Sequence, residues 1–162
     1  MRPRSRSART GYGWAAAAAA LLVGLGAAAP AMADPCEAIP RRGPMPAALK
    51  PGARFSGPVV YVGDGDSLCV AIGKGKGPAS WVEVRLLDYS APEITDLARK
   101  PWPAGIAARA ALERMAKGKT VQCVAAQRSY DRIGALCKLD GVSLGDRMRA
   151  AGVAEGGWGR VD

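Results

Sequence analysis

Three charged residues in the middle of the chain are of types that could bind and act on a phosphate group. Asp64 and Asp66 stand in a tight turn, Gly63-Asp64-Gly65-Asp66-Ser67. A carboxylate at the mouth of such a turn can offer oxygen to a hard cation such as Ca²⁺, with Asp66 as the direct ligand and Asp64 beside it. Arg85 falls on the polar face of an alternating run, where its planar guanidinium could hold two phosphate oxygens and offset charge that builds on phosphorus.

Each of these residues also has an ordinary structural interpretation. Asp-Gly is the commonest signal of a hairpin turn, so the segment from Asp64 to Ser67 could be a turn and nothing more. Arg85 could simply solvate the polar face of its strand. The basic residues that dominate the chain after residue 98 could form a solvated helix face, although an acidic segment beside a basic one also suits metal-assisted chemistry on a polyanion.

The chain contains no histidine, which limits the chemistry that it can perform. Ser-His-Asp hydrolysis, papain-like hydrolysis, HExxH metalloprotease chemistry and every nuclease that uses imidazole as its base need that side chain. A zinc site is not indicated either, because the four cysteines lack the spacing of a finger or ribbon. Any catalysis must therefore depend on carboxylates and arginines, with or without a hard metal ion.

The elements that must position these residues follow from the hydrophobic pattern. Alternating apolar runs separated by glycine-rich turns predict three strands, and two later runs around a polar loop at 125–132 predict two more. A helical period starts at Pro103 and stops at Gly118. A capping-box-like Ser143 opens a second helix that ends at Gly152. The predicted strands are residues 58–62, 67–72, 81–87, 120–124 and 133–139.

The order of three strands, a helix, two strands and a helix predicts an α+β fold that is mainly a β-barrel. It lacks the strand-helix alternation that indicates a parallel sheet. Five strands close most naturally into a small OB-fold barrel, here with two to three helices. Barrels of this type commonly bind oligonucleotides on their strand faces.

Two sequence blocks resemble the staphylococcal nuclease (thermonuclease) family. Residues 63–67, Gly-Asp-Gly-Asp-Ser, are similar to the family's DGD-T/S turn. Residues 85–93, Arg-Leu-Leu-Asp-Tyr-Ser-Ala-Pro-Glu, are similar to its R-L…D-A-P-E segment. Tyr130-Asp131-Arg132-Ile133-Gly134 resembles the D-R-Y-G-R loop, and residues 141–154 resemble the closing helix. The resemblance covers residues 57–154 and implies hydrolysis of DNA or RNA phosphodiester bonds.

The resemblance also implies a role for each site residue, and one position departs from the family pattern. Arg85 and Glu93 would be catalytic, with Glu93 as the general base that activates water. Ca²⁺ would be the cofactor, held at Asp66. Ser90 stands where the family carries its second metal-binding aspartate. A neutral hydroxyl is a weak Ca²⁺ ligand, so we expect weaker metal binding unless Asp88 or water substitutes.

A second departure concerns the cations that contact phosphate. Ala135 stands where the family carries its second phosphate-contacting arginine. Loss of such a donor typically costs a few kcal/mol of transition-state stabilisation. Arg132, three residues earlier, could reach the same oxygens from another angle, which makes it the third catalytic candidate.

The first 33 residues have the pattern of a secretion signal peptide, with a basic leader, an apolar stretch and the site Ala31-Met32-Ala33. We expect cleavage before Asp34 and a periplasmic or extracellular protein. An uncleaved membrane anchor is the alternative, but the apolar run is short for a span. Removing the leader takes away four arginines and no acidic residue from a chain of net charge +9, so the remainder stays basic. The other predicted regions are an irregular extension at 34–56, the barrel domain at 57–154 and a tail at 155–162.

All four cysteines lie after the leader, where oxidation to disulfides is expected. Sequence alone permits three pairings. Cys123 and Cys137 lie on two apolar runs that flank a polar loop, so they could face each other across a hairpin. Cys36 would then tie the N-terminal segment to Cys69.

Three functions are compatible with these features. The first is an exported, monomeric phosphodiesterase that cleaves DNA or RNA, weakened at Ser90 and Ala135. The second is a catalytically impaired OB-fold module that binds nucleic acid or another polyanion, with binding that depends steeply on salt. The third is a structural envelope protein held together by two disulfides.

Overall fold

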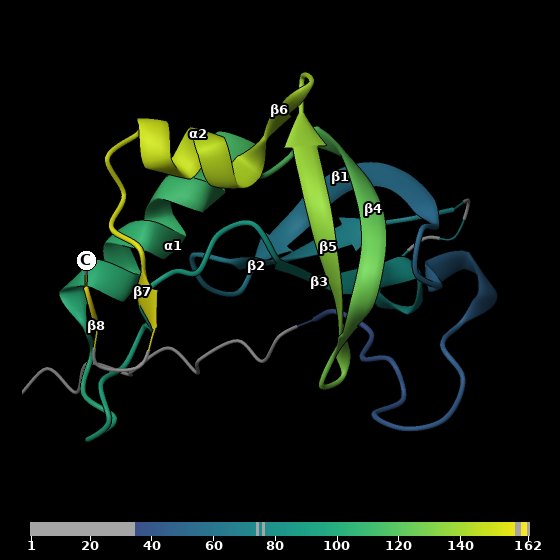
Figure 1. Cartoon of the computed structure of the whole chain (residues 1–162), viewed down its shortest axis with the longest axis horizontal. Helices are drawn as coiled ribbons and strands as arrows, with labels where there is room; N and C mark the ends of the chain where they lie inside the picture. Colours follow the sequence, from purple (N-terminus) through teal and green to yellow (C-terminus); the bar gives the residue numbers. More distant parts are fainter. Residues whose placement is uncertain (1–34, 74, 76, 158–159, 162) are drawn as a thin grey trace, which may run out of the picture. The chain divides into compact units, whose positions relative to one another are not determined.

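The computed structural model describes residues 35–73, 75, 77–157 and 160–161. The predicted signal peptide at 1–33 lies outside these residues. Alternating apolar residues build five strands that run in the spatial order β3-β2-β1-β4-β5, all antiparallel to their neighbours, and a parallel pairing of β3 with β5 closes them into a barrel (Figure 1). The predicted α+β, mainly β barrel is therefore confirmed. The strands are β1 (Arg54–Val62), β2 (Ser67–Ala71), β3 (Trp81–Leu86), β4 (Thr120–Ser129) and β5 (Arg132–Leu139).

Two α-helices accompany the barrel, α1 (Pro103–Ala116) and α2 (Leu144–Ala150). Pro103 occupies the first turn of α1, where its missing N–H costs nothing. The Ser143 hydroxyl accepts a hydrogen bond from the Asp146 backbone N–H, which is the predicted cap of α2. No helix among the described residues is both long and apolar enough to span a membrane. The short elements are η1 (Ala47–Leu49), η2 (Pro78–Ser80), β6 (Val142–Ser143), β7 (Gly156–Gly157) and β8 (Arg160–Val161).

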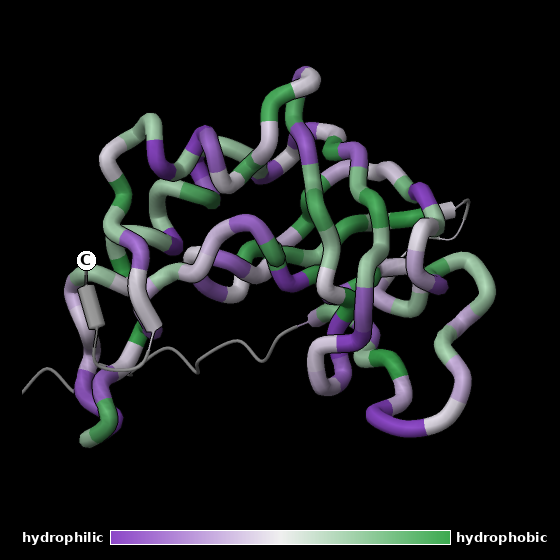
Figure 2. Tube along the Cα trace, viewed as in Figure 1, coloured by the Kyte–Doolittle hydropathy of each residue, from purple (hydrophilic) through white to green (hydrophobic). Residues whose placement is uncertain are grey.

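The core fills the barrel and extends beneath α1 and α2. Ala108 and Leu112 of α1 and Leu144 and Met148 of α2 are fully buried. Figure 2 shows that the hydrophobic segments gather along the barrel strands, whereas the turns are mostly hydrophilic. Burial of this contiguous apolar surface is the main stabilising contribution to the fold.

Two predicted boundaries differ from the structure. The loop expected at 125–132 is mostly strand, since β4 continues to Ser129 and β5 starts at Arg132, with Tyr130 in the left-handed conformation between them. The extension predicted at 34–56 is only partly irregular. β1 starts at Arg54, and Ile39 and Leu49 are buried in the core. The second half of β4 carries polar residues because its outer face is solvated, so its sequence resembles that of a loop. The extension has no periodic sequence pattern, and its position is fixed by tertiary contacts of Ile39 and Leu49 with the core.

Both predicted disulfides are present. Cys123 and Cys137 are directly opposite each other in the β4–β5 ladder, with their Cα atoms 4.1 Å apart. Cys36 is bonded to Cys69 of β2, with a Cα separation of 5.6 Å. The second disulfide joins the N-terminal extension to a core strand.

Candidate active site

An ion pair between a buried carboxylate and a partly exposed arginine lies at the centre of the predicted site. Asp66, which is 2 % exposed, precedes β2, and Arg85 extends from β3. The carboxylate oxygen Oδ2 of Asp66 accepts hydrogen bonds from Arg85 Nη2 at 3.0 Å and from the Ala91 backbone N–H at 3.0 Å. One carboxylate therefore orients the guanidinium and also fixes the segment that leads to Glu93.

The glycine of the Asp-Gly-Asp turn permits this arrangement. The Asp64 side chain accepts a hydrogen bond from the Asp66 backbone N–H at 2.9 Å, which is a turn that an aspartate can build with its own chain. A Cβ at Gly65 would lie 2.5 Å from the Ala91 Cβ and 2.6 Å from the Ala108 Cβ. Only glycine lets the turn pack against both α1 and the segment that precedes Glu93.

Glu93 is held by the start of α1. A Cβ at Gly105 would lie 1.9 Å from the Glu93 carbonyl oxygen, so the helix and the Glu93 backbone are in direct contact. Burial and the charge of Asp64 raise the pKa of Glu93, whereas the charges of Arg85 and Arg132 lower it. These charges act on one carboxylate, so the structure brings together five predicted residues: Asp64, Asp66, Arg85, Glu93 and Arg132.

Asp66 is electrostatically the most unusual group of this cluster. Burial and the neighbouring Asp64 raise the pKa of Asp66 to about 7, although Arg85 and the Ala91 N–H favour its charged form. A carboxylate with a pKa near neutrality is typical of functional sites, where local charges are arranged for chemistry rather than for stability.

Arg132 extends from β5 toward a residue that the sequence interpretation did not single out. Its Nε lies 3.7 Å from an oxygen of Glu83 on β3, and both side chains are less than one-fifth exposed. Glu83 is two positions before Arg85, on the same face of β3. The alternation of the run places Glu83 on that face, but it does not indicate that Glu83 pairs with Arg132.

The position that lacks the family's second arginine is part of the core. Ala135 is fully buried, and its carbonyl accepts a hydrogen bond from the Leu87 N–H. Arg132 is therefore the residue of β5 that supplies positive charge near Glu93. Arg149 of α2 also lies near Arg85. Both arginines line a pocket of about 330 Å³, and Arg149 forms an ion pair with Glu155, which lines the same pocket.

The structure does not assemble the calcium-ligand set that the sequence predicted. The Asp88 carboxylate is turned toward the start of α2, where it accepts a hydrogen bond from the Ser143 hydroxyl. The Ser90 hydroxyl donates to the Gly156 carbonyl at 2.8 Å. Among the described residues, no three Asp, Glu, Cys or His side chains come together as metal ligands.

Asp64 and Asp66 are the oxygen donors that remain of the predicted set. Ca²⁺ takes six to eight oxygen ligands, and two carboxylates leave most of these to water. The residues present therefore do not fit calcium as a tightly held resident ion. Asp88 was predicted as a substitute ligand, and in the structure one of its carboxylate oxygens is engaged by the Ser143 hydroxyl at the start of α2.

Substituting Ser90 tests this ligand assignment. We expect Ser90→Asp to strengthen Ca²⁺ binding about tenfold, because it adds a carboxylate that cannot donate to the Gly156 carbonyl. Isothermal titration with CaCl₂ measures the affinity. Asp88→Asn is the matched control and should leave Ca²⁺ affinity unchanged, so weaker binding by that variant would contradict the assignment.

Comparison with known proteins adds no further constraint on the site. No protein-family model matches the chain, and no curated protein matches it.

Proposed function

We propose that this chain is an exported phosphodiesterase of the staphylococcal nuclease type, which hydrolyses phosphodiester bonds of DNA or RNA. The observation that carries the proposal is Arg85, which is paired with a buried carboxylate, Asp66, and whose charge also acts on a second carboxylate, Glu93, of raised pKa. A cation that one acid orients and whose charge acts on a second acid suits attack by water on an anionic ester.

In the proposed reaction, Arg85 binds the non-bridging oxygens of the phosphodiester. Asp66 holds the guanidinium in place through one of its N–H groups, which leaves other donors for the phosphate. Arg132 adds a second positive charge on the same side. Glu93 accepts a proton from water while the water oxygen attacks phosphorus. The bond to the leaving oxygen then breaks, and solvent protonates that oxygen.

The raised pKa of Glu93 suits the role of a base that works near neutral pH. A base is most effective when its pKa lies near the working pH, because it is then both ionised and able to accept a proton. Glu93 must be deprotonated to act, so activity should rise with pH through its pKa. Because burial raises that pKa, the rise should lie at a higher pH than for an ordinary glutamate.

Arg132→Ala provides a pH test of the site. Arg132 lowers the pKa of Glu93, so its removal should move the acidic limb of the kcat/KM profile to higher pH. We also expect a loss of roughly tenfold to a hundredfold in kcat from the missing positive charge. Arg128→Ala on β4 is the control, because Arg128 is not among the charges that act on Glu93. An unshifted limb in Arg132→Ala would contradict the assignment.

The alternative function is an OB-fold module that binds nucleic acid or another polyanion without cleaving it. Two observations favour it: Ala135 is buried in the core, and Ser90 is engaged by the C-terminal segment. Both positions lack the charge that the resemblance would lead one to expect. The site retains positive charge, which is sufficient for salt-dependent binding.

One assay separates these functions. The chain from Asp34 onward is incubated with single-stranded DNA and with RNA, in the presence of Ca²⁺ or of EDTA, and release of acid-soluble nucleotides is measured. Release that Glu93→Gln abolishes supports the phosphodiesterase. Binding that weakens steeply with salt, without release, supports the binding module. Absence of both leaves the structural envelope role.

Export is part of the same proposal. The leader pattern supports it, and the two disulfides are of the kind that form in oxidising compartments.

A further inference from the structure

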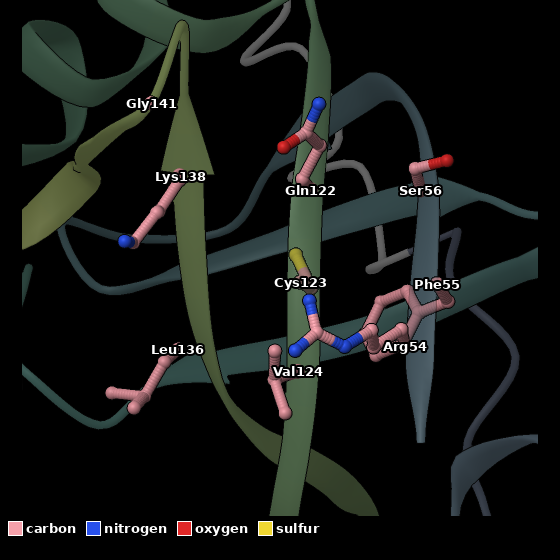
Figure 3. Close-up of a pocket in the computed structure, with 9 residues that line it drawn as sticks. All are labelled: Arg54, Phe55, Ser56, Gln122, Cys123, Val124, Leu136, Lys138 and Gly141. Atoms are coloured by element: carbon pink, nitrogen blue, oxygen red, sulfur yellow. The ribbon is translucent and has the colours of Figure 1, made fainter. Parts of the chain in front are cut away.

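The outer face of β1, β4 and β5 carries a groove of about 770 Å³ that is separate from the Asp66–Arg85 pair (Figure 3). Strand register arranges its side chains in two transverse rows, which Figure 3 shows one above the other. The first row is Arg54, Val124 and Leu136, and the second is Ser56, Gln122 and Lys138.

The groove combines positive charge with an apolar floor. Arg54 on β1 and Lys138 on β5 are exposed, and no acidic side chain lines the groove. Leu136 is 48 % exposed and lies next to the partly exposed Val124 in the register. Large aliphatic side chains at the centre of a solvated sheet face, with cations at both edges, are suited to a ligand that is itself anionic and partly apolar.

Strand β5 leads from the candidate active site to this groove. Outward positions alternate on that strand, so Gly134 and then Leu136 follow Arg132 on the same face. Gly134 is directly opposite Arg85 in the β3–β5 register. Leu136 is the next outward position, which corresponds to about 7 Å along the strand.

Leu87 extends the apolar surface between the two regions. It is exposed, and its side chain lies over Gly134, because a Cβ at that glycine would come within 2.9 Å of the Leu87 Cδ2 atom. A chain bound at Arg85 could therefore continue over an apolar path to the groove.

We propose that the groove binds the unpaired strand of a nucleic acid beyond the phosphodiester held at Arg85, an inference that rests on the proposed function. Bases would lie on the apolar floor formed by Val124 and Leu136, while phosphates would approach Arg54 and Lys138. A duplex turns its bases inward and offers mainly phosphates to a flat face, so the apolar floor favours single-stranded nucleic acid over a duplex.

Binding of a fluorescent oligothymidylate of about 16 nucleotides, the upper site size of one OB-fold, tests this proposal by anisotropy across a salt series. The variant Arg54→Ala/Lys138→Ala should bind roughly tenfold more weakly. A plot of log affinity against log salt concentration should have a slope that is shallower by about 1.4. Each phosphate contact to a single strand contributes about 0.7 to this slope, and the variant removes two such contacts. The control Arg42→Ala/Arg114→Ala removes the same charge from exposed positions outside the groove and should bind as the parent does.

A second variant separates base contacts from charge. Leu136→Asn removes the apolar surface without adding charge and should weaken oligothymidylate binding roughly tenfold, while the melting temperature stays near that of the parent, since the side chain is half exposed. Groove variants that bind like the control would overturn the proposal. Equal competition by polyglutamate would also overturn it, in favour of an acidic protein partner, and equal competition by duplex DNA would overturn the single-strand assignment.

Hydrolysis of a dinucleotide distinguishes failure of the groove from failure of the proposed function. A dinucleotide held at Arg85 is too short to reach Arg54 or Lys138, so Arg54→Ala/Lys138→Ala should hydrolyse it as the parent does. On a long single strand, the same variant should show a KM raised roughly tenfold at unchanged kcat. If the parent hydrolyses neither the dinucleotide nor the long single strand but binding still depends on the groove, the phosphodiesterase proposal fails and the binding surface stands.

Discussion

Glu93→Gln should lower kcat for phosphodiester hydrolysis by about 10²- to 10⁴-fold, the usual contribution of a positioned general base. Glutamine preserves the shape of the side chain but cannot accept the proton of the attacking water. Binding of oligothymidylate should persist, because the cations of the site are untouched. Initial rates on single-stranded DNA, measured at several pH values, give the comparison.

The pH profile makes this prediction specific to Glu93. In the parent, log(kcat/KM) should rise with pH and level off above the raised pKa of Glu93, whereas the residual rate of Glu93→Gln should lack that inflection. Glu113→Gln is the matched control. Glu113 is a half-exposed glutamate of α1 that forms an ion pair with Lys117, so its substitution should change neither the rate nor the profile. A Glu93→Gln rate within about threefold of the parent would contradict a base role.

Arg85→Ala should reduce kcat by about 10²- to 10³-fold and also destabilise the fold. The rate falls because a donor to the developing phosphate charge is lost. The fold is destabilised because Asp66 keeps its carboxylate in a nearly dry position without its cation. At about pH 8 we expect a loss of roughly 2–3 kcal/mol in the free energy of unfolding, less than for a fully buried pair because Arg85 is partly exposed.

The stability loss should depend on pH in a defined direction. The pKa of Asp66 is about 7 in the folded protein and 3.8 for an ordinary aspartate. Between these values the folded state binds more protons than the unfolded state, so stability falls as pH rises through this window. Arg85 lowers the pKa of Asp66, and its removal raises that pKa further. The difference between Arg85→Ala and the parent should therefore be small near about pH 5 and largest above neutrality.

Urea unfolding across pH, with a double variant, tests this coupling. Asp66→Asn removes the buried charge, so Arg85→Ala/Asp66→Asn should recover stability relative to Arg85→Ala at alkaline pH, while activity stays low. Arg114→Ala, an exposed arginine of α1, controls for loss of a positive charge. A stability difference that does not change with pH would show that Asp66 and Arg85 are not coupled as the geometry indicates.

The sequence alone identified the local elements of this protein. Strands β1 to β5, both helices and the Ser143 cap follow from periodicity and turn residues, and position across a hairpin indicated that Cys123 could face Cys137. All of these depend on residues near one another in the chain. Errors occurred where that local signal ended, as in the outer half of β4, whose polar face resembles a loop.

The sequence also identified the charged residues of the site, but only the tertiary structure determined their burial, their pKa values and their ion pairs. The 2 % exposure of Asp66 and its raised pKa arise from packing of the turn at Gly65 against α1 and the segment at Ala91, together with the charge of Asp64. The turning of Asp88 toward α2, and the Arg132–Glu83 pair, depend on strands and helices that are distant in the chain. Sequence pattern specifies residue type and local geometry, whereas burial, charge pairing and ligand sets are properties of contacts that form only when the barrel closes.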